Sequence, residues 1–155
     1  MSEAGKREGA YELMIRVEES AGVFYQACAG KFPERGDFWL TLASAEEAHV
    51  RFLRDLARDP ADASAFAYRR RTAVPPLKIL LDFLSRNLAT LETTSLTLVH
   101  ALAIARDIEN SVLEKQILEA VPGDPPHVRK TIQRMNAETG EHRTRIEAAL
   151  AEFKT

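Results

Sequence analysis

Three glutamates lie where an amphipathic helix ordinarily carries apolar residues, and they give the strongest chemical signal in this sequence. The first is Glu18, whose neighbours at three-, four- and seven-residue spacing are all apolar or aromatic. Those neighbours are Tyr11, Met14, Ile15, Ala21, Gly22 and Tyr25. The adjacent Glu19 instead shares a helix face with polar residues, as a solvent-exposed glutamate does. Glu18 is therefore predicted to point into the core.

The same spacing places the other two glutamates on apolar helix faces. Glu46 and His49 share a face with Leu42, Ala43 and Leu53. Glu109 shares a third face with Leu102, Ala105, Val112 and Leu113, and Arg106 is its one polar neighbour. A glutamate is almost never buried alone, because an uncompensated charge in the interior costs several kcal/mol. Three neighbouring carboxylates would also repel, so the pattern predicts a divalent metal ion that neutralises them.

Glu46 and His49 form a Glu-x-x-His motif, which adds specificity to this prediction. At a spacing of three residues both side chains reach the same side of a helix, so a carboxylate oxygen and an imidazole nitrogen can enter one coordination sphere. The motif alone arises by chance in helices rich in glutamate. Its combination with an inward glutamate on each of two other helices is more specific. A hydrogen-bonded polar network without metal is the alternative explanation.

Proline and hydrophobic periodicity mark the helices that must position these residues. Apolar residues recur at three- and four-residue steps between the prolines, without strand-like alternation, which predicts an all-α protein. The predicted helices span 8–31, 37–58, 77–91, 95–120 and 127–153. The expected fold is a ferritin-like four-helix bundle, in which a long crossover with the short helix 77–91 joins the second and third main helices.

Length, charge and cysteine usage limit the classes of protein. The chain has 155 residues and a formal net charge of −2, which predicts one domain over 1–155 and no nucleic-acid partner. No apolar run reaches the roughly 18 to 20 residues that a membrane span needs. The first residues are polar and lack a secretory signal, so we expect a cytoplasmic protein. Cys28 is the one cysteine and is expected to be a core residue.

Most of the chain, apart from the crossover, resembles a rubrerythrin-like protein of the ferritin-like di-iron carboxylate family. The run VEESAGVFYQACAGKFPERGDFWLTLASAEEAHVRFL resembles the first half of that domain, with a glutamate seven residues before a tyrosine, a short turn and an EExH helix. ALAIARDIENSVLEKQ followed by NAETGEHRTRIEAAL is similar to the family's repeat of this unit.

The resemblance implies a ligand set, a metal and an activity. The implied metal ligands are Glu18, Glu46, His49, Glu109 and His142, with Glu46 as a bridging carboxylate. The implied metal is iron, at one or two ions per chain, with another divalent metal as the alternative. The resemblance also implies a homodimer and an oxidoreductase of the ferroxidase or peroxidase type, which oxidises Fe(II) or reduces peroxide and takes electrons from a separate donor.

The second half departs from the family pattern three residues before His142. Thr139 stands there, where the family has another bridging glutamate. The neighbouring Glu138 lies about 100° around the helix and would reach the centre only through a distortion near Gly140. Val112 also replaces a further family glutamate. Two alternatives to an enzyme therefore stay open: a non-catalytic bundle with one metal ion, and a metal-free helical module that binds proteins.

Other residues that could carry chemistry receive simpler interpretations. The arginine run 69–71 is expected to be a solvated part of the crossover, and His127 is expected to be exposed. His100 lies nine residues before Glu109, on the opposite side of the helix, so it cannot share the site. Tyr25 and Trp39 are expected to be core or interface aromatics, although the Tyr25 hydroxyl could approach the metal.

Overall fold

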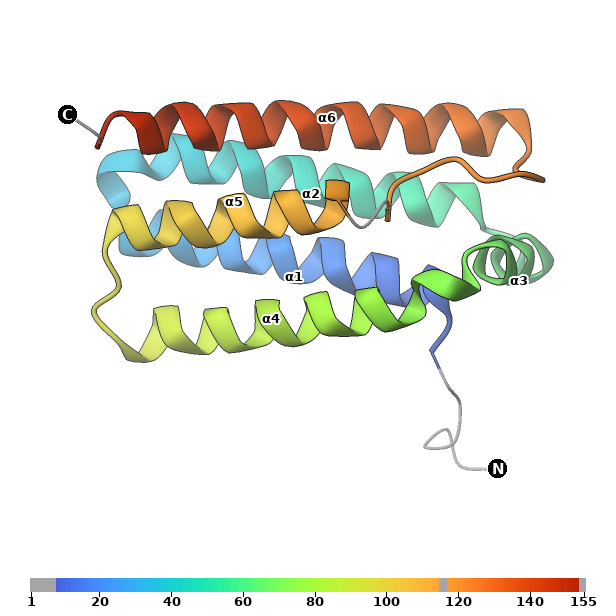
Figure 1. Ribbon diagram of the computed structural model, residues 1–155, viewed down its shortest axis with the longest axis horizontal. Coiled ribbons are helices and arrows are strands. Elements are labelled where there is room, and N and C mark those ends of the chain that lie inside the picture. The colour runs from blue at the N-terminus through green and yellow to red at the C-terminus, as the bar shows by residue number, and fades with distance from the viewer. Residues whose placement is uncertain (1–7, 115–116, 154–155) are drawn as a thin grey trace.

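The computed structural model describes residues 8–114 and 117–153, and every regular element within them is helical. Six α-helices follow one another along the chain (Figure 1). They are α1 (Ala10–Lys31), α2 (Gly36–Leu56), α3 (Pro60–Arg69), α4 (Val74–Thr93), α5 (Leu98–Glu114) and α6 (Pro126–Ala151). Two short 3₁₀ turns, η2 (Pro33–Arg35) and η3 (Arg71–Ala73), precede α2 and α4. The expected all-α fold is confirmed.

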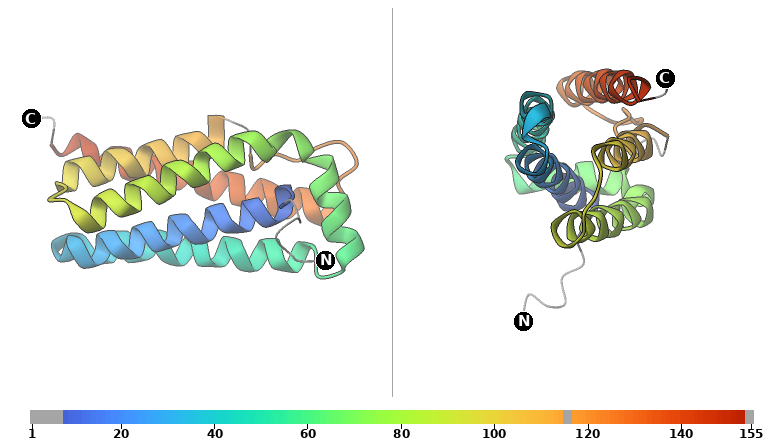
Figure 2. Two further views of the ribbon diagram at one scale, coloured as in Figure 1. Left: turned by 90° about the horizontal axis from the view of Figure 1, so that it is seen from below. Right: turned by 90° about the vertical axis from the view of Figure 1, so that its left-hand side faces the viewer.

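The five long helices pack around a common core. In the end-on view α1, α2, α6, α5 and α4 follow one another around the bundle, and each packs on the next (Figure 2). α3 lies across one end (Figure 1). α2 and α5 run in the same direction, because α4 returns the chain along the full length of the bundle (Figure 1). This confirms the predicted long crossover between α2 and the helix that carries Glu109.

The crossover itself contains more helix than was predicted. The helix expected at 77–91 is the 20-residue α4, which packs along α1 as a fifth long helix. It begins at Val74 because Pro75 and Pro76 fall in the first turn, where a helix needs no backbone donor. α3 was not predicted, although its start follows a familiar pattern. The Asp59 carboxylate accepts a hydrogen bond from the Ala61 amide at 2.7 Å, and Pro60 follows the cap.

The prediction for the helix at 95–120 was wrong at both ends, because α5 spans Leu98–Glu114. It begins later because Thr97 acts as the cap, with its hydroxyl accepting from the His100 amide at 3.2 Å. Residues 115 and 116 lie outside the described part of the chain. Ile117 and Leu118 form a turn, in which the Ile117 amide donates to the Val112 carbonyl at 3.1 Å. Both side chains are buried in the core, which favours the turn over a continued helix.

The remaining three helices lie within two residues of their predicted bounds, and the short turn before α2 is also as expected. The core contains Phe24, Tyr25 and Trp39 as its largest fully buried aromatic residues near one end of α1 and α2. Cys28 is fully buried among them, and burial raises the pKa of its thiol to about 12. Its predicted role as a core residue is confirmed. Within the described residues, no helix is long and apolar enough to cross a membrane.

An ion-pair cluster joins the crossover to the connection between α5 and α6. Arg70 is buried and forms a two-point contact with Asp124, Nη1 to Oδ1 at 2.9 Å and Nη2 to Oδ2 at 2.6 Å. Its guanidinium also lies 3.9 Å from the centre of the Phe66 ring. Arg69 Nε donates to the same carboxylate at 2.8 Å. The prediction of a solvated run is therefore wrong for Arg69 and Arg70, whereas Arg71 is exposed as expected.

Candidate metal centre

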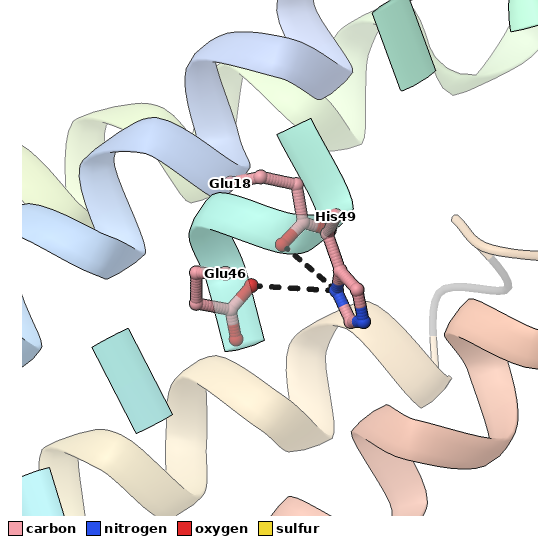
Figure 3. Close-up of side chains that lie close together, drawn as sticks. All are labelled: Glu18, Glu46 and His49. Atoms are coloured by element: carbon pink, nitrogen blue, oxygen red, sulfur yellow. Dashed lines mark ion pairs between the residues drawn. The ribbon is translucent and has the colours of Figure 1, made fainter. Parts of the chain in front are cut away.

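Four of the long helices bring the five predicted site residues together in the core. α1 contributes Glu18, α2 contributes Glu46 and His49, α5 contributes Glu109 and α6 contributes His142. Their exposed fractions are between 0% and 6%, which confirms that all three glutamates face inward. Figure 3 shows the part of the cluster on α1 and α2, where the two carboxylates face the His49 ring.

The five residues form two triads that share Glu46. In the first, His49 Nδ1 lies 3.5 Å from Glu18 Oε2 and 3.6 Å from Glu46 Oε2 (Figure 3). In the second, His142 Nδ1 lies 3.7 Å from Glu46 Oε1 and 3.8 Å from Glu109 Oε1. Within each triad the donor atoms lie within 4.8 Å of one another. Glu46 thus presents one oxygen to each histidine, and its carboxylate lies between two potential cation positions.

The spacing and chemistry of the donor atoms in both triads suit a metal ion. These nitrogen-to-oxygen distances are too long for good hydrogen bonds, and both Nδ1 atoms are buried without a hydrogen-bond partner among the described residues. An unsatisfied buried polar group costs about 1 to 3 kcal/mol. A cation in each triad, about 2 Å from its donors, would satisfy the histidine nitrogen of that triad while leaving the donors about 3 to 4 Å apart. The residues therefore fit two divalent cations that share one carboxylate.

Electrostatics also favour positive charge in the cluster. Burial, together with repulsion from Glu46, raises the pKa of Glu18 and Glu109 well above the ordinary value. Burial would raise the pKa of Glu46 as well, but its interactions with Glu18 and the two histidines lower it overall. Burial acts to lower the pKa of His49, yet Glu18 and Glu46 outweigh it and raise that pKa to about 11. Without a metal ion, protons therefore neutralise the cluster. A cation that bound there would displace them.

Tyr25 contacts the second triad from α1. Its hydroxyl donates to Glu109 Oε1 at 2.7 Å, and its ring stacks on Trp39 with centroids 6.0 Å apart. Both aromatic side chains are fully buried, as predicted. The oxygen that accepts this hydrogen bond is the one that lies 3.8 Å from His142 Nδ1, so Tyr25 helps to hold it in the second triad.

Glu138 makes a contact with the cluster that the sequence interpretation missed. Its Oε2 lies 2.8 Å from His49 Nε2, on the far side of the ring from Glu18 and Glu46. Because Glu138 is an ionised acceptor with a lowered pKa, Nε2 must donate, and Nδ1 is directed toward the carboxylates. α6 continues without a break through Gly140, so Glu138 reaches His49 without the helix distortion that the sequence interpretation required. Glu138 lies four residues before His142, a spacing that places both on neighbouring parts of one face.

The structure also shows the two positions at which the sequence departs from the rubrerythrin pattern. Thr139 is buried, but its hydroxyl donates to the Met135 carbonyl at 2.9 Å and it offers no carboxylate to the cluster. Val112 is a buried apolar residue. His100 and His127 are exposed and take no part in either triad, as predicted.

We expect Glu138→Ala to weaken cation binding at the Glu18 triad by about 10- to 100-fold, since carboxylates that orient a liganding histidine commonly contribute this much to affinity. A chelator-competition titration of the wild type and the variant measures the effect. The matched control is Glu141→Ala, which removes an exposed carboxylate on the same helix. A positioning role requires that affinity at the Glu109 triad stay unchanged, and an equal loss at both triads would contradict it.

No protein-family model, curated protein or solved structure matches this chain. The chain is therefore described by its own structure, a helical bundle whose core contains two Glu/His triads that share Glu46.

Proposed function

We propose that the protein binds two divalent metal ions, with iron as the physiological metal, in a ferritin-like dinuclear carboxylate centre. The observation that carries this proposal is the division of the Glu46 carboxylate between two triads, each with a buried histidine nitrogen that lacks a hydrogen-bond partner. The resemblance to rubrerythrin-like sequences supports iron. The ligand chemistry agrees, because iron binds both carboxylate and imidazole ligands. The same resemblance supports a homodimer.

The proposed activity is that of a di-iron oxidoreductase, and a bound iron pair would supply the electron-transfer chemistry toward Fe(II) or peroxide. The protein residues have narrower tasks. Glu18, Glu46, His49, Glu109 and His142 hold the ions. Tyr25 holds a proton against Glu109, and the apolar core packs around the triads. Because Cys28 is buried and alone, we propose that electrons come from a separate donor protein.

A mononuclear, non-catalytic metal protein is the second candidate, and an asymmetry between the triads favours it. His49 is oriented by Glu138, while Thr139 leaves the other side of the centre without a further carboxylate. Under this alternative the Glu18 triad binds one ion tightly, and the Glu109 triad binds weakly.

Metal stoichiometry after anaerobic reconstitution with Fe(II), followed by desalting and elemental analysis, tests both candidates. We expect two ions per wild-type chain and one per chain in Glu109→Ala, which leaves the Glu18 triad intact. One ion in the wild type would favour the mononuclear candidate. No retained ion, and no change in thermal stability on adding a chelator, would refute both, since a ligand at 100 times its Kd stabilises the folded state by about 2.7 kcal/mol.

A further inference from the structure

A groove between α1 and α2 connects solvent with the first triad. It has a volume of about 330 Å³, and Glu18 is the site residue that lines it. Exposed residues form its walls, among them Glu19 and Val23 from α1 and Glu47 and Arg51 from α2. A buried carboxylate of the cluster is therefore adjacent to an open space on the surface.

Gly22 brings the groove close to the shared carboxylate residue. It lies one turn after Glu18 on the same face of α1 and also lines the groove. A Cβ atom built at Gly22 would lie 3.5 Å from the Glu46 Cβ and 3.8 Å from the Ala43 carbonyl oxygen. The two helices thus approach closely beside Glu46, and the buried residues that line the groove are Glu18, Gly22 and Val50.

We propose that this groove is the access route by which hydrated divalent cations reach the centre, with Glu18 as the first ligand that they meet. The inference rests on the proposed metal-binding function. The mouth of the groove offers the exposed carboxylates of Glu19 and Glu47 as transient ligands, and these two charges offset those of Arg51 and Arg54, which also line it.

The wall carboxylates are free to exchange partners. Glu47 accepts from Gln26 Nε2 at 3.1 Å and Glu19 lies 3.4 Å from Arg54 Nη2, so each pair bridges the groove from α1 to α2. Both pairs are exposed, so water competes for each contact, and an exposed ion pair such as that of Glu19 with Arg54 contributes only about 0 to 1 kcal/mol. Either carboxylate can therefore turn from its partner to a passing cation at little cost.

The rate of Co²⁺ uptake by the metal-free protein, followed by stopped-flow visible absorption, tests the role of the groove charges. We expect the double variant Glu19→Gln/Glu47→Gln to take up Co²⁺ at least fivefold more slowly than wild type at low ionic strength, with unchanged final stoichiometry. The control Glu34→Gln/Glu147→Gln removes the same charge from exposed positions outside the groove and should stay within twofold of wild type. The difference should disappear near 1 M salt, where the Debye length is about 3 Å.

A steric variant tests the same route without changing charge. Val23 is 50% exposed on the groove wall, and Val23→Phe is expected to slow uptake at least threefold at any ionic strength. Leu40, 49% exposed on α2 away from the groove, provides the control Leu40→Phe. If the wild type binds Co²⁺ and both groove variants load at the wild-type rate, the access route is overturned while the proposed function stands. If the wild type binds no Co²⁺, the proposed function itself fails.

Discussion

Glu46→Ala is expected to abolish the binding of both metal ions. Its two carboxylate oxygens belong to different triads, so one substitution removes a donor from each and also removes the only carboxylate that the two triads share. Each triad would then keep one glutamate and one histidine, too few donors to hold an ion through desalting. Elemental analysis after Fe(II) reconstitution should give fewer than about 0.2 ions per chain, against two in the wild type.

Glu47→Ala is the matched control for this experiment. Glu47 is the next residue on α2, but its side chain is exposed and belongs to neither triad. This variant should retain two ions at equilibrium. A Glu46→Ala protein that still retained one tightly held ion would show that one triad functions without the shared carboxylate, and the dinuclear proposal would have to be abandoned.

Asp124→Asn should have the largest effect on folding stability, a loss of about 3 to 5 kcal/mol in the free energy of unfolding. The substitution leaves the Arg70 guanidinium buried without its carboxylate partner, and a buried unpaired charge is strongly destabilising. For a domain of this size the melting temperature should fall by roughly 6 to 20 °C. Urea unfolding of the metal-free protein measures the free energy without any contribution from ligands.

The loss should depend on pH in a defined direction. Burial raises the pKa of Asp124, but hydrogen bonds from Arg70, Val121 and Arg69 outweigh it and hold the pKa at about 2, below the ordinary 3.8. The ionised form therefore stabilises the folded state fully above about pH 3.8, and this contribution disappears as the pH falls toward 2. The gap between wild type and Asp124→Asn should narrow over that interval.

The exposed pair of Asp55 and Arg58 provides the comparison for this prediction. It has a similar nitrogen-to-oxygen distance of 2.7 Å, but both side chains are largely exposed. Asp55→Asn should cost no more than about 1 kcal/mol, because solvent screens such pairs. Equal effects for the two substitutions would show that the Arg70 contact with Asp124 is not an important element of the fold.

The sequence was sufficient to predict which faces of the main helices are buried, because this information repeats every three to four residues within one segment. Glu18, Glu46 and Glu109 stood out because each interrupts such an apolar stripe, and their burial follows from the same periodicity. The bounds of α1, α2 and α6 were predictable for a related reason. Proline, glycine and capping residues act within a single turn of the chain.

Contacts that depend on how two helices are placed relative to each other were not predictable. Glu138 meets His49 because α6 packs against α2 at one particular rotation, and residues 89 positions apart give no local sign of this. Arg70 finds Asp124 across 54 residues for the same reason. A sequence interpretation therefore predicts three solvated arginines, because it does not show that Asp124 lies beside two of them in the fold. The length of α4 was underestimated because the Thr93 hydroxyl bonds back to the Ala89 carbonyl, so this threonine extends the helix and does not cap a new one.

The site residues come from two separate helical hairpins, and a bound metal would therefore link the local unfolding of one hairpin to that of the other. Glu18, Glu46 and His49 come from the α1–α2 hairpin, whereas Glu109 and His142 come from the α5–α6 hairpin. The two hairpins are natural units of local unfolding, and Glu46 lies at the seam between them. Cations held at Glu46 would fasten one unit to the other. Loss of metal would then loosen the α5–α6 hairpin as a whole, so that the occupancy of the centre determines whether the protein behaves as one cooperative unit or as two.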